Sequence, residues 1–517
     1  MLKFITLFHM NLLLIILVFI SISCLIKLSP KSFNIIILLT CCCVIFSYFE
    51  LTKNFPEHSF LPQKYQYEQD CRYNRLVHSI RNHRLDFEEN VPDILNDQNI
   101  YKNFSYYLTN IPILFNFYDL STYKGKIYIY WGLTPLLLFY LPFNLITNLY
   151  LSDNFVVFVL ISLVFLLSLL ILKQIFNITF VKRDYRENVL FYLSTLLIGF
   201  GNYSLFIAIR PSICEVVISC AAVLLLLSIY LFIKYSTQTK YNKTIIFFIG
   251  LLLSFSVGCR PHYILFIPIF YFFIIYIEHI KGKGIKDILK TSLIFLLPCI
   301  VYGNILALYN YLRFDSIFEF GWKYQLNHML QYYYTPTLKD FIIGFKHHLF
   351  QFPQISKESY TVFSLVKVTG HRIGNELITG LIYIYPLSIF LILSPILFFI
   401  KCNKKVIILL FILIFFVNFS TACFFGMIQR YVFEYTYILT TVTLMILFIY
   451  YYNASKDMKN IILISFIFLV IFTLYINISL LLSFNHLTVF ARIESLPFYE
   501  KLINFLFNTK MAFRLTA

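Results

Sequence analysis

The segment YDLSTYKGKIYIYWGLTPLLLFYLPF, residues 118–143, decides how the rest of the chain is arranged. It begins with polar, lysine-bearing residues typical of a turn and continues directly into aromatic and aliphatic residues. The apolar part, 131–150, is long enough to cross a bilayer, which takes about 20 helical residues. Whether this part crosses determines which side of the membrane every later loop faces.

The composition is typical of a polytopic membrane protein. Of the 517 residues, 59% are hydrophobic and 13% are charged, whereas soluble domains hold about 25% charged residues. Most of the 11 cysteines lie in apolar segments, where cysteine packs as a small hydrophobic residue, so we expect no disulfide framework. The net charge of +17 falls mainly in short loops, as the orientation rule for membrane helices requires. We therefore expect no nucleic-acid partner.

Apolar segments recur along the chain, and we predict an all-α membrane protein with about 12 transmembrane helices. The expected helices are 8–26, 33–49, 155–175, 189–209, 213–233, 245–257, 263–277, 288–308, 377–400, 406–425, 432–452 and 461–483. The expected organisation is two helices in 1–50, a first outer loop in 51–153, six helices in 154–309, a second outer loop in 310–376, four helices in 377–483 and a tail in 484–517.

Charge parity then predicts the position of residues 131–150. Basic residues favour the cytoplasmic side of the membrane. Every second connection after residue 154 is basic, with these residues: Lys182, Arg183, Arg186, Lys234, Lys240, Lys243, Lys281, Lys283, Lys286, Lys290, Lys401, Lys404, Lys405, Lys456 and Lys459. Lys27 and Lys31 place the short loop between the first two helices in the cytoplasm and hence the first long loop outside. Parity then holds only if 131–150 does not cross. We predict that it docks along the outer leaflet; the alternative is that it spans and another predicted span does not.

The loops expected on the outer side place charged and aromatic residues at the membrane boundary. The residues in question are Arg210, Glu215, Arg260, His262, Arg313, Glu319, Trp322, Arg430 and Glu434. Residues 245–277 are too few for two full crossings, so the tip GCRPHY should be recessed. An arginine at that depth is costly and normally faces a bundle interior or an aqueous cavity. Arg430 and Glu434, four residues apart, could instead form a simple surface ion pair.

An outward cavity with several arginines and a few carboxylates suits a phosphate-bearing ligand. Guanidinium groups bind phosphate through paired hydrogen bonds, and a nearby carboxylate can act as a general base for an attacking hydroxyl. Aromatic residues near Trp131 and Trp322 would line paths for a sugar or a lipid chain. Together these features indicate a lipid-linked phosphosugar as ligand.

Several motifs resemble those of the GT-C superfamily of polytopic glycosyltransferases, such as protein O-mannosyltransferases and the aminoarabinose transferase of lipid A. The similar motifs, in order, are an acidic loop ahead of Tyr73 and Leu76, the opening segment, IRPSICEVV, GCRPHY, YNYLRFDSIFEFGWKYQL and QRYVFEY. The resemblance covers most of the chain. It implies a GT-C-like fold, a polyprenyl-phosphate sugar donor, an outer active site and a membrane-docked helix beside the donor site.

The resemblance also implies roles for particular residues. Asp70 matches the catalytic base, with Glu68 and Asp119 as reserves. Lys126 matches the donor-phosphate lysine, and Arg210 with Glu215 matches the second outer loop. Together with the outer-loop residues above, this predicts that Lys126, Arg210, Arg260 and Arg430 bind the donor phosphate and that Glu215, His262, Trp131, Arg313, Glu319 and Trp322 line the substrate. No Asp-x-Asp motif occurs in the outer loops, so no cofactor is assigned, although a divalent metal is compatible with this chemistry.

The sequence therefore predicts a multi-pass protein of a bacterial inner membrane that transfers a sugar to an outer glycan, lipid or protein. Two other classes stay open. An O-antigen polymerase or ligase would depend on Arg313 and Arg372 more than on Asp70. A lipid or solute transporter would be expected to carry charges at mid-membrane and an inverted repeat.

Overall fold

The computed structural model describes residues 30–53, 60–64, 71–87, 120–181, 183–238, 242–325, 336–355, 363–364, 366–367, 377–391, 405–426 and 428–484. The helices are α2 (Pro30–Lys53), α3 (Arg72–Arg81), α6 (Leu141–Thr147), α7 (Asp153–Thr179), α8 (Tyr185–Phe200), α9 (Ser204–Ala208), α10 (Ile213–Thr237), α11 (Lys243–Val257), α12 (Phe266–Ile280), α13 (Ile285–Phe314), α15 (Leu338–Phe350), α16 (Leu381–Ile384), α17 (Lys405–Phe425), α18 (Gln429–Asn453) and α19 (Lys456–Phe484). Tighter or wider helical turns are η4 (Leu136–Tyr140), η5 (Pro261–Leu265), η6 (Trp322–Tyr324) and η7 (Pro386–Leu391). The strands are β1 (Leu120–Tyr123), β2 (Lys126–Ile129), β3 (Gln354–Ile355), β4 (Phe363–Ser364), β5 (Val366–Lys367) and β6 (Leu377–Ile378), paired antiparallel as β1–β2, β3–β4 and β5–β6.

The described part of the chain contains nine helices that are long and apolar enough to cross a membrane. Each corresponds to a span predicted from the sequence. The predicted span 245–257 forms the shorter helix α11, and 8–26 lies outside the described residues. The protein is thus mostly helical and multi-pass, while the full number of crossings stays a prediction.

The predicted span 377–400 differs from expectation in its described part. Residues 377–391 form β6, α16 and η7 instead of one continuous helix. Gly380 lies so close to residues 349–351 that a Cβ there would come within 2.4 Å of the Gln351 nitrogen, and Pro386 interrupts helical hydrogen bonding. The apolar composition of this segment therefore reflects burial against neighbouring elements.

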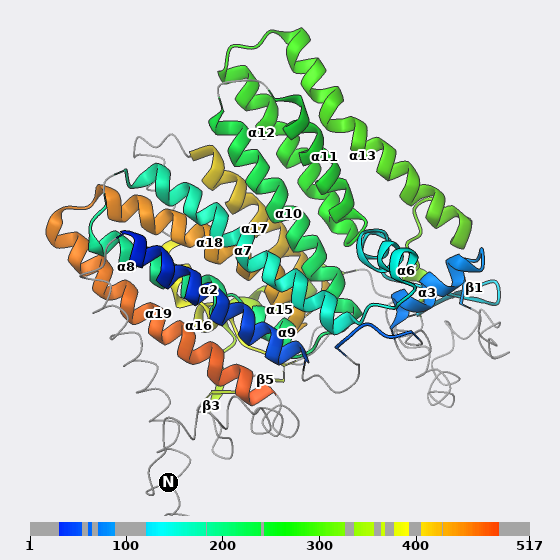
Figure 1. Cartoon of the computed structure of the whole chain (residues 1–517), viewed down its shortest axis with the longest axis horizontal. Helices are drawn as coiled ribbons and strands as arrows, with labels where there is room; N and C mark the ends of the chain where they lie inside the picture. The colour runs from blue at the N-terminus through cyan, green and yellow to red at the C-terminus, as the bar shows by residue number, and fades with distance from the viewer. Residues whose placement is uncertain are drawn as a thin grey trace, which may run out of the picture.

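The long helices form one bundle with α18 at its centre (Figure 1). The most apolar window of α18 is completely buried. Helix α10 packs on α7 and α11, α11 packs on α13, and α17 packs on α18. The outer helices α2, α13 and α19 are buried over only 22–33% of their most apolar windows, so their remaining apolar surface suits contact with lipid.

The two ends of the bundle carry different connections. The α12–α13 connection lies at the top of Figure 1 and the α18–α19 connection at its left, and both hold or adjoin basic residues. Helix α3, the β1–β2 hairpin and α6 lie at the opposite end. The charge rule therefore favours a cytoplasmic position for the first end.

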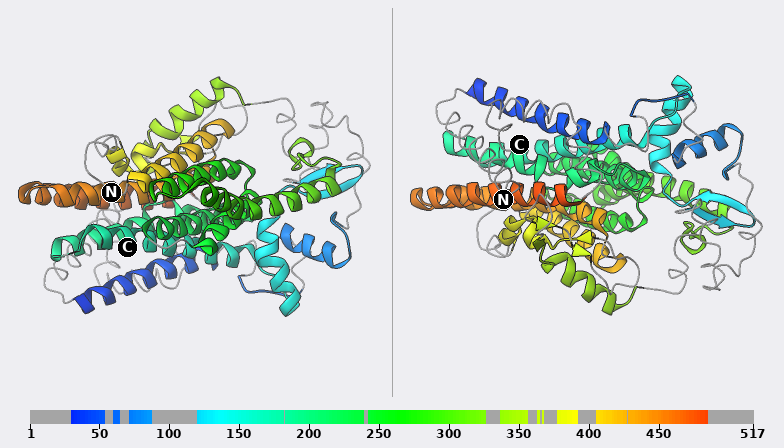
Figure 2. Two further views of the ribbon diagram at one scale, coloured as in Figure 1. Left: turned by 90° about the horizontal axis from the view of Figure 1, so that it is seen from above. Right: turned by 90° about the horizontal axis from the view of Figure 1, so that it is seen from below.

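The opening segment of the sequence folds as a hairpin followed by a short helix. Tyr123 pairs with Lys126, and Lys124 and Gly125 between them have positive φ angles of 48° and 71°, as a two-residue type I′ turn requires. The following helical residues Leu136–Thr147 are about 18 Å long and run across the long helices (cyan in Figure 2). This helix is too short to cross a hydrocarbon core of about 30 Å.

Candidate anion-binding pocket

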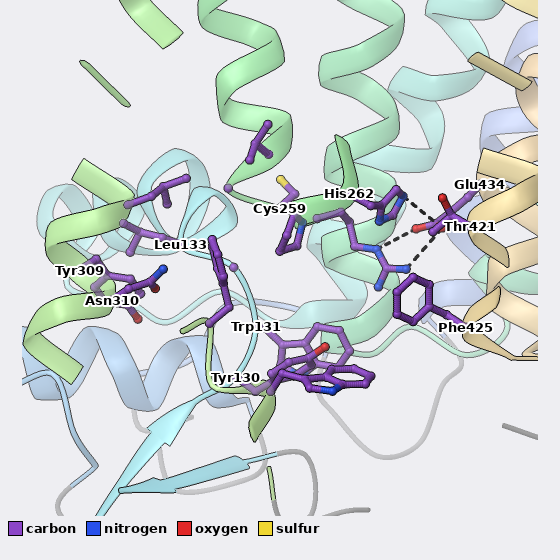
Figure 3. Close-up of a pocket in the computed structure, with 18 of the residues that line it drawn as sticks. Tyr130, Trp131, Leu133, Cys259, His262, Tyr309, Asn310, Thr421, Phe425 and Glu434 are labelled. Atoms are coloured by element: carbon purple, nitrogen blue, oxygen red, sulfur yellow. Dashed lines mark hydrogen bonds and ion pairs between the residues drawn. The ribbon is translucent and has the colours of Figure 1, made fainter. Parts of the chain in front are cut away.

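A cavity of about 250 Å³ lies where the hairpin end of the molecule meets the bundle. Six segments contribute its walls: Tyr130–Leu133, Val257–His262, the last two turns of α13 with Arg313, Phe320 with Trp322, the end of α17 and the start of α18. Figure 3 shows Tyr309 and Asn310 on one side, Glu434 on the opposite side, and Tyr130 with Trp131 beneath. Residues from both long loops thus meet at one site.

The β1–β2 hairpin is fixed to the end of α13 and to the second loop. The Ser121 hydroxyl donates to the Gly321 carbonyl over 2.8 Å, and Arg313 Nη1 donates to the Ile129 carbonyl over 2.7 Å. Phe314 packs edge-on against Tyr128, with ring centroids 5.4 Å apart. These contacts place Tyr130, which follows the hairpin, beside the second-loop residue Trp322, with ring centroids 6.1 Å apart.

Glycines allow the next part of this segment to lie against the end of α11. A Cβ on Gly132 would lie 2.0 Å from the Gly258 carbonyl oxygen, so only glycine permits this approach. The Thr134 amide donates to the same carbonyl over 3.1 Å. Tyr73 of α3 completes the contact because its hydroxyl donates to the Gly132 carbonyl over 2.7 Å. The pocket wall is therefore built by backbone contacts between segments far apart in sequence.

Arg313 is a buried cation held by neutral groups. Its side chain donates to the Ile129 carbonyl and to Asn310 Oδ1, and its guanidinium lies 3.8 Å from the Tyr309 ring centroid. No carboxylate lies within ion-pair distance of it among the described residues. Because burying an uncompensated charge is costly, Arg313 favours an anion in the pocket.

Arg260 is buried beside a carboxylate from α18. Arg260 Nε lies 2.9 Å from Glu434 Oε1, and Nη2 donates to Oε2 over 3.3 Å. The shorter contact is an ion pair without hydrogen-bond geometry, because neither of its two atoms has a hydrogen-bond partner among the described residues. The side chains are 12% and 1% exposed. His262 Nε2 lies 3.9 Å from Glu434 Oε2, and dashed lines in Figure 3 mark these contacts.

Aromatic rings line the pocket floor. Tyr130 contacts Trp131 and Trp322 with centroid separations of 4.9 and 6.1 Å, and Trp322 contacts Phe425 at 6.3 Å. Besides Arg260 Nε and Glu434 Oε1, three buried polar atoms of lining residues have no hydrogen-bond partner among the described residues, namely Trp131 Nε1, His262 Nε2 and Tyr309 Oη. Buried polar atoms normally find partners, so these atoms favour a polar ligand.

The pocket brings together Trp131, Arg260, His262, Arg313 and Trp322 from the residues that the sequence singled out. Arg210, Arg430, Glu215, Glu319 and Lys126 do not line it. The structure also corrects one interpretation: Glu434 is buried against Arg260 and is not part of a surface pair with Arg430. Helical spacing indicates neighbours on one helix, whereas this contact joins two helices.

The remaining predicted residues have other surroundings. Glu215 is buried and accepts a hydrogen bond from Ser212, while Glu319 accepts from the Gly321 and Lys323 amides. Arg210 is exposed. Asp70, Glu68, Asp119 and Arg372 lie outside the described residues.

Lys126 lies on β2 near a carboxylate that sequence reasoning missed. Its Nζ is 3.8 Å from Asp86 Oδ1, and Arg84 Nη2 donates to Asp86 Oδ2 over 2.5 Å. Burial raises the pKa of Asp86, but the Arg84 hydrogen bond and the Lys126 charge outweigh it, so the pKa is lowered overall. The sequence did not single out Asp86 as a site residue because it is one of several acidic residues in the same loop.

Within the described part of the chain, no group of three or more His, Cys, Asp or Glu side chains could hold a metal ion. The ionisable groups of Arg, Glu and His that line the pocket are two guanidiniums, one carboxylate and one imidazole.

No protein-family model matches the chain, and no curated protein matches it. Among solved structures, the chain is similar to the apo oligosaccharyltransferase of Archaeoglobus fulgidus, with a TM-score of 0.49 and 10% sequence identity. The match covers 86% of this chain and 56% of that protein. The chain thus spans little more than half the length of this neighbour. At this level of likeness, function must be inferred from the site itself.

The geometry of the site defines what it can bind. The pocket combines buried guanidinium groups with aromatic rings and unpartnered polar atoms. Guanidiniums bind phosphate oxygens, and rings pack against apolar faces of sugars or lipids. An amphipathic, phosphate-bearing ligand fits all three features.

Proposed function

We propose that this protein is a membrane glycosyltransferase that moves a sugar from a polyprenyl-phosphate donor to an acceptor on the outer side of the membrane. The observation that carries the proposal is a single pocket lined by the largely buried Arg260 and Arg313 together with several aromatic rings. Two guanidiniums and one carboxylate give this lining a net positive charge. Such a site suits an anionic leaving group.

An apolar groove beside the pocket supports a lipid-linked donor. It is lined by Phe247, Leu251, Phe255, Leu297, Pro298, Val301, Tyr302 and Ile305 of α11 and α13. The same two helices contribute Val257, Leu306 and Tyr309 to the pocket. Leu297 and Val301 are more than half exposed on a predicted transmembrane helix. A prenyl chain could therefore lie in this groove with its phosphate in the pocket.

The proposed reaction is a direct displacement at the anomeric carbon. Asp70 would accept the proton of the acceptor hydroxyl, whose oxygen forms the new bond to that carbon. The bond between this carbon and the phosphate oxygen breaks, and the polyprenyl phosphate leaves with the electron pair. Arg260 and Arg313 would stabilise the charge that develops on the departing phosphate. Direct displacement inverts the configuration of the sugar.

Support for Asp70 comes from its neighbours in the chain. Asp70 immediately precedes Cys71, which is fully buried, and α3. Tyr73 of α3 donates to the carbonyl of Gly132, a pocket residue. The acidic segment is therefore joined to an element that contacts the pocket wall.

The test is complementation of a strain that lacks the gene, with profiling of its glycans and lipids. We expect the wild type to restore a missing sugar and Asp70→Asn to lower transfer about a hundredfold or more, as for loss of a general base. Asp315→Asn is the matched control, since Asp315 pairs with Lys124 at the hairpin surface. Full activity of Asp70→Asn would refute this assignment of the base. An unchanged sugar profile with altered lipid distribution would favour a transporter.

A further inference from the structure

Glu434 adds a negative charge to the pocket lining, and the proposed reaction assigns no role to this carboxylate. The charged lining residues are Arg260, Arg313 and Glu434, with His262 beside them. Glu434 contacts Arg260 at 2.9 and 3.3 Å, while Arg313 has only neutral acceptors. With a neutral imidazole, one guanidinium charge is thus compensated and the other is not.

Charges outside the pocket lining act on the same groups: Arg430 acts on Glu434, and Glu319 acts on Arg313. Arg430 lies one turn before Glu434 but does not line the pocket, and its charge also acts on the buried Glu215. The carboxylate of Glu434 is 1% exposed and its helix is the most buried of the bundle. The carboxylate is held in place by its ion pair with Arg260, and solvent screens its charge weakly.

Resting on the proposed function, we infer that Glu434 is a specificity-determining residue that limits the negative charge of the group the pocket accepts. The uncompensated charge of Arg313 matches a phosphodiester, which carries a single negative charge. A group with more negative charge gains a further attraction to Arg313 but is repelled by Glu434. Replacing Glu434 by glutamine removes this repulsion at nearly constant shape.

Binding can be followed without a label because both tryptophans of the chain, Trp131 and Trp322, line the pocket. The probes form a series with one tail and increasing charge: farnesol, farnesyl methyl phosphate, farnesyl phosphate and farnesyl diphosphate. Tryptophan emission of the full chain in lipid nanodiscs gives a Kd for each probe. The decisive quantity is the ratio of the Kd for the diphosphate to the Kd for the diester.

We expect Glu434→Gln to change this ratio about tenfold or more in favour of the diphosphate, because two charges a few ångströms apart interact strongly in a pocket of low dielectric constant. Glu434→Asp keeps the charge and should keep the ratio of Kd values. If the glutamine variant does not fold, the aspartate variant is measured in its place. Glu278→Gln is the matched control: Glu278 is equally buried and accepts a hydrogen bond from Tyr235, but it lies at the far end of α12. It should leave every Kd unchanged.

Other outcomes overturn the inference in distinguishable ways. If Glu434→Gln weakens all probes, farnesol included, by one common factor, Glu434 only maintains the fold and the inference fails alone. If the wild type binds farnesol as tightly as the charged probes, or binds none of them, the proposed donor site fails as well.

Discussion

At the scale of single residues, the sequence identified the cations of the pocket better than its anion. Arg260 and Arg313 stand out because placing an arginine next to apolar helices costs free energy, so such arginines usually face a cavity or a partner. Glu434 stands four residues after Arg430, a spacing that predicts contact on one helix, whereas its partner Arg260 follows α11. Lys126 was expected to bind the donor phosphate. It is the exposed first residue of β2, and the other three residues of this strand are buried.

The indole of Trp131 provides a residue-scale prediction. Trp131 is 7% exposed, and its Nε1 has no hydrogen-bond partner among the described residues. Trp131→Phe keeps an aromatic ring but removes the donor, so we expect the Kd for farnesyl phosphate to rise about fivefold to tenfold, the value of one net hydrogen bond. Trp322 remains as the fluorescent reporter. An unchanged Kd would mean that the indole serves only as an apolar wall.

At the scale of elements, composition predicted helices more reliably than contacts between them. The long apolar segments became α7, α10, α13, α17, α18 and α19. Residues 377–391 did not form one continuous helix, because Gly380 packs closely against residues 349–351 and Pro386 interrupts helical hydrogen bonding, and hydropathy shows neither effect. The approach of Gly132 to Gly258 was also invisible, since neither glycine lies in a recognisable turn motif and their contact joins distant segments.

This contact makes Gly132 a test of how the hairpin segment supports the pocket. Gly132→Ala would place a methyl group 2.0 Å from the Gly258 carbonyl oxygen, and such overpacking typically costs about 1–3 kcal/mol. We expect a lower melting temperature in detergent and shifted emission from the adjacent Trp131. Gly303→Ala is the control because a Cβ there meets nothing within 4 Å. It should be neutral or stabilise α13 by about 1 kcal/mol. Equal melting temperatures for the two variants would show that the segment tolerates displacement.

At the scale of the whole molecule, the distribution of basic loops agrees with the direction in which the helices run. The basic connections gather at one end of the bundle, and the hairpin and pocket lie at the other (Figure 1). The sequence could predict this separation because basic loops alternate strictly along the chain. It could not predict which loop residues meet, since the partners in the pocket come from segments separated by up to about three hundred residues.

The docked position of the segment after the hairpin is the feature on which the topology depends. Lys124 precedes helix Leu136–Thr147 and Thr147 ends it, and both residues are exposed, while Lys283 is half-buried in the basic connection between α12 and α13. If the helix lies along the membrane, an impermeant thiol reagent added outside should label both Lys124→Cys and Thr147→Cys above the background of the unmodified chain. Lys283→Cys should require access from inside. Labelling of Thr147→Cys only together with Lys283→Cys would mean that this segment crosses the bilayer, which would invert the assigned side of every later loop and move the pocket to the cytoplasmic face.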